Sequence, residues 1–146
     1  MKLTEIQQNW EQDSRIDETN LGRESTRVPT LHSKYLSVLS KVKLQLRKAE
    51  SDYYNTRRLK YRYYRGEMSR EELQVLEWVQ FNGNKPLKNE MDEFLQCDKD
   101  LIELQDKMEY FKTVIYTLEQ ILRSINSRTW DIKTAVEWHK FTNGMM

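Results

Sequence analysis

The 146-residue sequence contains few of the residues that end helices or form tight turns. It has four glycines and two prolines, whereas a fold of many short strands needs a turn signal at each reversal of the chain. In addition, 32% of its residues are charged, so the composition favours long, exposed helices over an all-β fold. Its single cysteine, Cys97, excludes an intramolecular disulfide and a zinc site with several cysteine ligands. We therefore expect a reducing, cytoplasmic compartment.

Long apolar runs and common enzyme motifs are also missing. No apolar run approaches the ~18 residues of a membrane-spanning helix, and residues 1–10 lack the apolar core of a secretion signal. The sequence contains no glycine-rich phosphate loop, no His-Glu-x-x-His and no Cys-x-x-Cys. The two histidines, His32 and His139, stand far apart. We therefore expect no membrane contact, no catalytic activity, no metal site and no cofactor.

The net charge of +1 conceals a strong asymmetry along the chain. Residues 41–65 carry nine basic and two acidic side chains, a net charge of +7. Residues 66–110 carry five basic and twelve acidic side chains, a net charge of −7. A block of one sign usually marks a binding surface or a solvated tail. Because the basic block also contains five tyrosines, and disordered tails are poor in aromatic residues, we interpret it as a binding surface.

The apolar pattern predicts a first long helix over residues 31–65. Pro29 resets the backbone, Thr30 is a candidate N-cap, and apolar residues then recur every three or four positions. Gly66 follows the last turn, where a C-cap glycine is expected. Before this helix, residues 1–28 are expected to form a polar arm with one short helix.

Residues 67–90 have weaker signals. Ser69, followed by glutamates, is expected to open a short helix. Asn82-Gly83 is a turn signal, which fits either a small hairpin or a loop packed by Trp78 and Phe81.

Two heptad series predict a second long helix over residues 89–126. Each series repeats every seven residues, and all positions are apolar or cysteine: Phe94, Leu101, Met108, Ile115 and Leu122, then Cys97, Leu104, Phe111, Leu118 and Ile125. This pattern is typical of a coiled-coil-like seam, on which Cys97 would be a buried, unreactive thiol. A separate last helix is expected over residues 129–141, with apolar residues on more than one side: Trp130, Ile132, Val136, Trp138 and Phe141.

These elements predict an all-α fold, a long antiparallel helical hairpin with short terminal helices. Helices of about 35 residues are about 50 Å long at 1.5 Å per residue, which exceeds the diameter of a compact globule of this size. Such a hairpin covers its apolar stripes poorly, so we expect other subunits to cover the rest.

The most basic part of the chain, residues 57–66, combines cations with tyrosines. On a helix, three arginines share one face that Tyr54 and Tyr61 border, and further basic residues fall on an adjoining face. Because cations bind phosphates and aromatic rings stack on unpaired bases, this combination favours single strands over duplex. The expected DNA-binding residues are Arg57, Arg58, Lys60, Tyr61, Arg62, Tyr64 and Arg65. In the alternative interpretation, the arginines only pair with acidic residues of the second helix or of another subunit.

Several short sequences resemble a known family in their order and spacing. They are Ile16-Asp17, Glu24-Ser25, PTLHSKY from Pro29 to Tyr35, YYRG from Tyr63 to Gly66, DKDLI from Asp98 to Ile102, RTWDIK from Arg128 to Lys133 and EWHKF from Glu137 to Phe141. Together with the total length, they make the chain similar to the UvsY family, the recombination mediators of tailed phages. The family's DNA-binding motif reads Leu-Lys-Ala-Arg-Leu-Asp-Tyr-Tyr before a glycine. Matching its end to Tyr63, Tyr64 and Gly66 places Arg58 at the family's lysine and Lys60 at its arginine.

The resemblance implies a protein that is not an enzyme and that binds single-stranded DNA. It implies a ring-like homo-oligomer, a hexamer or heptamer, acting in the cytoplasm of the host cell. The expected partners are a RecA-type recombinase, similar to UvsX, and the phage single-strand-binding protein. Members of the family load the recombinase onto strands that are coated by the single-strand-binding protein. Residues 1–128 would form the arm and the DNA-binding hairpin, and residues 129–146 the oligomerisation element. The alternative is a structural coiled-coil scaffold or adaptor that binds no nucleic acid.

Overall fold

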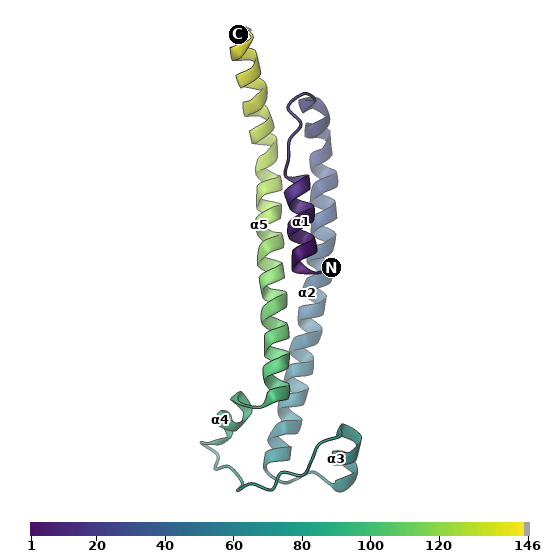
Figure 1. Cartoon of the computed structure of the whole chain (residues 1–146), viewed down its shortest axis with the longest axis vertical. Coiled ribbons are helices and arrows are strands. Elements are labelled where there is room, and N and C mark those ends of the chain that lie inside the picture. Colours follow the sequence, from purple (N-terminus) through teal and green to yellow (C-terminus); the bar gives the residue numbers. More distant parts are fainter. Residues whose placement is uncertain (145–146) are drawn as a thin grey trace. The chain divides into compact units, whose positions relative to one another are not determined.

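The computed structural model describes residues 1–144, and over this range its regular secondary structure consists of helices joined by loops (Figure 1). The order of elements is α1 (Leu3–Asp13), α2 (Leu21–Tyr64), α3 (Arg70–Leu76), α4 (Met91–Gln96) and α5 (Lys99–Thr142). The prediction of an all-α fold built on a long helical hairpin, formed by α2 and α5, is confirmed. The chain divides into two compact units: unit 1 contains residues 1–44 and the chain from residue 111 onward, and unit 2 contains residues 45–110.

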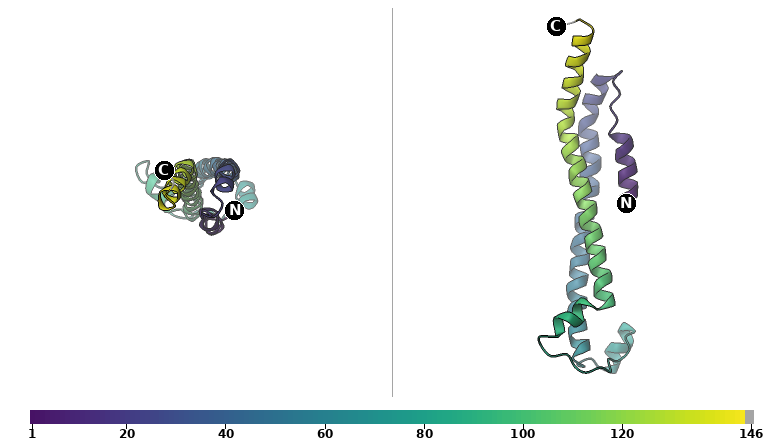
Figure 2. Two further views of the ribbon diagram at one scale, coloured as in Figure 1. Left: turned by 90° about the horizontal axis from the view of Figure 1, so that it is seen from above. Right: turned by 60° about the vertical axis from the view of Figure 1, so that its left-hand side comes forward.

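Unit 1 is built from α1 and from segments of α2 and α5. Here α1 lies beside both long helices and runs antiparallel to α2 (Figures 1 and 2). Ile6 of α1 is completely buried, and Trp10 contacts the ring edge of Tyr35 at a centroid distance of 5.6 Å. The remaining buried core comes from α2 and α5: Leu31, Tyr35, Leu39, Val42, Val114, Leu118, Ile121, Leu122 and Ile125. Burial of each large apolar side chain contributes about 1.5–3 kcal/mol, which explains why the polar N-terminal arm forms a helix on this core.

Helix α2 begins ten residues earlier than the sequence predicts, at Leu21 instead of Leu31. Its start is capped by Asn20, whose side-chain oxygen accepts a hydrogen bond from the N–H of Arg23 at 3.2 Å. Pro29 therefore lies inside the helix and does not reset the backbone. A proline removes one helical hydrogen bond, but Pro29 itself is exposed while Leu31 is buried in the core. The packing of the flanking turns holds the helix together across the proline.

The predicted second helix is interrupted, and Cys97 is exposed, so the expectation of a buried thiol is wrong. Helix α4 ends at Gln96, and α5 begins at Lys99 because the Asp98 carboxylate caps it. Asp98 Oδ1 accepts hydrogen bonds from the N–H groups of Asp100 at 3.0 Å and Leu101 at 3.1 Å. The heptad pattern continues in phase across this break, which is why the pattern did not predict it.

Beyond the break, α5 continues without interruption to Thr142, so the last helix expected from Thr129 is not a separate element. Arg128, only 3% exposed, fixes this region by donating to the carbonyl oxygens of Ser14 at 3.1 Å and Arg15 at 2.9 Å. Its guanidinium also forms an ion pair of 2.9 Å with Glu24. The last two residues of the expected oligomerisation element, 145–146, lie outside the described residues.

In residues 67–90 the loop alternative holds. Ser69 caps α3 as expected, with its hydroxyl oxygen accepting the N–H of Glu72 at 3.2 Å. The chain from residue 77 to 90 contains no strand, and so no hairpin forms around Asn82-Gly83.

Two features are absent from the part of the chain that the structure describes. None of its helices has an apolar stretch long enough to cross a membrane. Residues 1–144 also contain no group of three or more histidine, cysteine or acidic side chains arranged to hold a metal ion.

Candidate nucleic-acid interface

The basic end of α2 is fixed by its C-terminal cap. The N–H of Gly66 donates to the carbonyl oxygen of Tyr63 at 3.1 Å, and the N–H of Glu67 donates to that of Arg62 at 3.0 Å. Gly66 has a φ of +70°, which suits glycine because it has no Cβ. The predicted C-cap is confirmed, and it turns the chain sharply after Arg65.

A cluster of aromatic rings holds the following segment against this end of α2. Tyr63 contacts the rings of Trp78 and Phe81 at centroid distances of 5.5 and 6.0 Å. Tyr64 contacts Phe81 at 5.1 Å and Phe94 of α4 at 5.5 Å. The Tyr63 hydroxyl also donates a hydrogen bond to the carbonyl oxygen of Val79. These contacts bring residues 77–90, a loop of weak local pattern, next to the arginines of α2.

Lys60 is buried in unit 2, unlike the sequence expectation of an exposed DNA contact. It is 7% exposed, and its Nζ lies 2.8 Å from Asp100 Oδ2 and 3.2 Å from Asp98 Oδ2. The same ammonium group lies 4.1 Å from the centroid of the Trp78 ring, a cation–π contact. These contacts of Lys60 are all with other side chains of unit 2. The reason is the break before α5, which places two carboxylates beside Lys60.

Tyr64 also has internal partners. Its hydroxyl donates to Asp98 Oδ2 at 2.6 Å. Burial is the larger cause and this hydrogen bond to a carboxylate the second, and both raise the pKa of the Tyr64 phenol. Tyr64 and Lys60 therefore connect the end of α2 to the start of α5, and both position the surface residues beside them.

The four arginines of the predicted site remain at the surface. Three have a carboxylate partner from a different segment: Arg57 with Asp92 of α4 at 3.6 Å, Arg62 with Glu72 of α3 at 2.9 Å, and Arg65 with Glu67 at 3.1 Å. The hydrogen bond from Arg62 lowers the pKa of Glu72. Arg58 is exposed and has no ion pair within residues 1–144. Exposed ion pairs contribute only about 0–1 kcal/mol each, so a DNA phosphate can replace the carboxylates at small cost.

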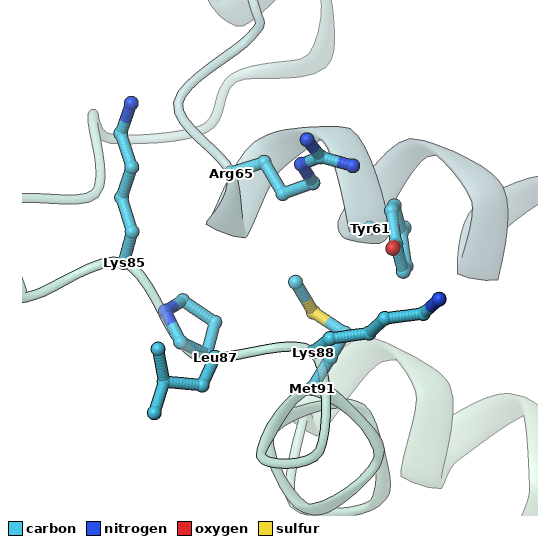
Figure 3. Close-up of a pocket in the computed structure, with 7 residues that line it drawn as sticks. Tyr61, Arg65, Lys85, Leu87, Lys88 and Met91 are labelled. Carbon is cyan, nitrogen blue, oxygen red and sulfur yellow. The ribbon is translucent and has the colours of Figure 1, made fainter.

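Beside Tyr61 and Arg65 the structure contains a pocket of about 490 Å³ (Figure 3). Two lysines of the loop, Lys85 and Lys88, complete its cationic lining, and its apolar lining consists of Pro86, Leu87 and Met91. Figure 3 shows the Arg65 guanidinium directed toward Tyr61, 5.6 Å from the centroid of that ring.

Sequence reasoning missed Lys85 and Lys88 because they lie in the block of net charge −7. Their place in the fold depends on the aromatic cluster and not on a local pattern. In the folded chain Lys85 approaches the end of α2 closely, since a Cβ at Gly66 would lie 3.3 Å from Cε of Lys85. The glycine that ends α2 therefore also leaves room for the lysine.

The residues expected to mediate oligomerisation divide into two groups in unit 1. Ile132 is 5% exposed and Val136 half-buried. Trp130, Trp138 and Phe141 are each more than 60% exposed, and the rings of Trp138 and Phe141 stack at a centroid distance of 5.9 Å. The three aromatic residues are exposed apolar surface, whereas Ile132 is part of the packed interior.

Comparison with known proteins identifies the family. The family described as "Recombination, repair and ssDNA binding protein UvsY" matches residues 9–145. The chain belongs to the UvsY family. It is 26% identical over 144 residues to the recombination protein uvsY of Enterobacteria phage T4, and this match covers 99% of both chains.

Solved structures of the UvsY family show the same fold. One crystal structure of the bacteriophage T4 recombination mediator protein UvsY, lattice type II, has a TM-score of 0.84 at 25% identity and covers 98% of each chain. A second, lattice type IV, also has a TM-score of 0.84 at 25% identity and covers 97% of this chain and 99% of that one. The arrangement of α2 and α5 is therefore a property of the UvsY fold.

Proposed function

We propose that this protein is a recombination mediator that binds single-stranded DNA without sequence specificity and has no catalytic role. It helps to load a RecA-type, UvsX-like recombinase onto strands coated by the phage single-strand-binding protein, in the cytoplasm of the host cell. The observation that carries the proposal is the surface at the end of α2, where Arg57, Arg58, Arg62 and Arg65 lie beside Tyr61. Family membership and the similarity to a recombination mediator protein support it.

The mechanism is non-covalent. The arginines bind phosphates, and their present carboxylate partners are released as the strand binds. Phosphate contacts are independent of base sequence, so this binding is not sequence-specific. Binding in this way changes the conformation of the DNA strand. The recombinase then displaces the single-strand-binding protein from the strand by mass action.

We further propose that the chain acts as a ring-like homo-oligomer, a hexamer or heptamer, with residues 129–146 as the oligomerisation element. The exposed aromatic residues Trp130, Trp138 and Phe141 support this assignment, because exposed apolar clusters mark interaction surfaces. Several copies on one strand raise the effective concentration, and this avidity adds about 10²- to 10⁴-fold in affinity.

The test of DNA binding is a salt titration with a fluorescent single-stranded oligonucleotide. Combining Arg58→Ala with Arg62→Ala should weaken binding and reduce the steepness of the log–log salt dependence by about 1.4, or about 0.7 for each lost phosphate contact. The matched control combines Arg23→Ala with Arg123→Ala, two exposed arginines of unit 1. Equal effects of the two pairs would contradict the proposed surface.

The alternative is a structural scaffold or adaptor, which the observed pairing of three arginines with carboxylates favours. A scaffold predicts no tight, salt-sensitive binding of single strands by the wild-type protein at physiological ionic strength. The same titration therefore separates the two functions. Loading is then tested by whether the Arg58→Ala, Arg62→Ala protein still accelerates recombinase assembly on coated strands.

A further inference from the structure

We propose that the pocket between Tyr61 and Lys85 binds one nucleotide of the single strand, both its phosphate and its base. The inference rests on the proposed function and extends it, since it assigns a defined subsite between the end of the basic helix and the loop of residues 77–90. The pocket's volume of about 490 Å³ lies within the range of about 300–1,000 Å³ that small-molecule sites occupy.

The charges of the pocket favour an anion. Three cationic side chains line it, those of Arg65, Lys85 and Lys88, and no carboxylate does. Arg65 is paired with Glu67, but neither lysine has an ion pair among residues 1–144. Both lysines are exposed, so their ammonium groups are free to move toward a phosphate. The pocket therefore has a net positive charge, because three cations surround it and only one of them has a carboxylate partner. The rest of unit 2 contrasts with it, since this unit contains more acidic than basic residues.

The uncharged lining favours a flat, aromatic group. Tyr61 lies at one side of the pocket, and Pro86, Leu87 and Met91 supply apolar surface. The guanidinium of Arg65 lies over the Tyr61 ring, and planar guanidinium groups stack on bases as aromatic rings do. A nucleobase has a suitable shape for this surface, whereas a simple phosphate ion would leave the apolar lining unused. The ligand that satisfies both parts is a nucleotide unit.

Two features show that the fold maintains this pocket. The absence of a Cβ at Gly66 leaves room for Lys85, and the ring contacts of Phe81 hold the preceding part of the loop against Tyr63 and Tyr64. Met91 is only 3% exposed and belongs to the small core beneath the site, with Leu95 and Leu101. The pocket therefore has a packed base and exposed, charged side chains at its rim.

The phosphate half of the proposal is tested with the full chain and a short oligo(dT) strand. Combining Lys85→Ala with Lys88→Ala should weaken binding at least several-fold and reduce the salt slope by about 0.7, the value for one lost phosphate contact. The control pair, Lys48→Ala with Lys99→Ala, removes the same charge from two exposed lysines of unit 2 that do not line the pocket. Equal losses of affinity in the two double variants would show only a general effect of charge and would overturn the proposed nucleotide site.

The base half is tested by comparing oligo(dT) with a strand of abasic sites of the same length. Tyr61→Leu should weaken binding of oligo(dT) about 5- to 100-fold, the range expected for loss of one stacked base, and leave binding of the abasic strand unchanged. Tyr61→Phe keeps the ring and should bind both strands like the wild type. Equal weakening on the two strands would mean that Tyr61 only packs against the core.

A measurement without substitution covers the case in which Tyr61→Leu fails to fold. An oligonucleotide that carries 5-iododeoxyuridine is irradiated on the wild-type protein, and the cross-linked peptide is found by mass spectrometry. A cross-link to Tyr61 or to another residue that lines the pocket supports the proposal, and cross-links confined to residues outside the pocket overturn it. If wild-type protein binds oligo(dT) but the pocket variants match their controls, the subsite is wrong and the proposed function stands. If the wild type does not bind oligo(dT), the proposed function itself fails.

Discussion

Buried charged side chains connect separate parts of this chain. In unit 1, Arg128 links α5 to the loop after α1 and to Glu24 of α2. In unit 2, Lys60 links the end of α2 to Asp98 and Asp100 at the start of α5. Each network buries a charged side chain away from water. Such a charge is stable there only while its oppositely charged and hydrogen-bonding partners are present. Such residues determine how the helices join.

Lys60→Ala should lower the free energy of unfolding by about 3 kcal/mol, because it leaves the Asp98 carboxylate buried without its cation. Arg58→Ala is the matched control, since Arg58 is an exposed cation of the same helix, and its change should stay within about 0.5 kcal/mol. Urea unfolding followed by circular dichroism measures both. Equal stability of the two variants would contradict the buried network and return Lys60 to the list of direct DNA contacts.

Asp13 in unit 1 predicts a pH dependence of stability. Burial opposes its ionisation, but hydrogen bonds from Lys34 at 2.6 Å and from the Tyr35 hydroxyl at 2.7 Å outweigh this and lower the pKa of Asp13. A carboxyl whose pKa is lower in the folded state stabilises the fold above its unfolded pKa, and this stabilisation is lost as the pH falls through the folded pKa.

Asp13→Asn should therefore cost about 1–3 kcal/mol near neutral pH, the range for hydrogen bonds to a charged group. The difference from the wild type should shrink as the pH falls below about 4, the ordinary pKa of an aspartate. Thermal unfolding at several pH values measures this, with Glu11→Gln, an exposed carboxylate of α1, as control. A difference that does not change with pH would mean that the side chain acts only through packing.

At the scale of the helix, Pro29 is the feature of α2 that conflicts most with local preference. It occupies the ninth position of the helix, where the missing N–H and the ring clash cost about 3 kcal/mol relative to alanine. Pro29→Ala should therefore raise the unfolding free energy by about 1–3 kcal/mol, as measured by thermal or urea unfolding. A loss of stability would show that the core around Leu31 needs the backbone geometry that the proline imposes.

The elements that the sequence predicted correctly have local signals. The cap at Ser69 and the glycine at Gly66 are each determined by side chains within a few residues. The start of α2 and the break at Asp98 were not predicted, although Asn20 and Asp98 are local capping residues, because Pro29 and the uninterrupted heptads indicated other boundaries. The continuity of α5 was not predicted because it depends on tertiary contacts. The same distinction applies to the site. The exposed arginine face followed from helical spacing, whereas the burial of Lys60 and the position of Lys85 depend on segments that approach only in the folded chain.

At the scale of the whole molecule, the basic block does not give its own unit a positive charge. Residues 45–110, which form unit 2, carry twelve basic and fourteen acidic side chains, a net charge of −2. The net charge of this unit therefore does not attract a polyanion at long range, and affinity has to come from short-range contacts at the arginines and the pocket. A single subunit offers few such contacts, so the proposed function depends on several copies binding one strand.

This dependence predicts that assembly and DNA affinity are lost together. Combining Trp138→Ala with Phe141→Ala removes the stacked, exposed aromatic pair at the end of α5, and should lower the particle mass in light scattering while helicity is retained. Affinity for a long single strand should then fall by about 10²- to 10⁴-fold as avidity is lost. Tyr116→Ala, which removes an exposed aromatic side chain elsewhere on α5, is the control. An unchanged mass would place the assembly surface elsewhere, and a lower mass with unchanged affinity would show that one subunit binds DNA without help from its neighbours.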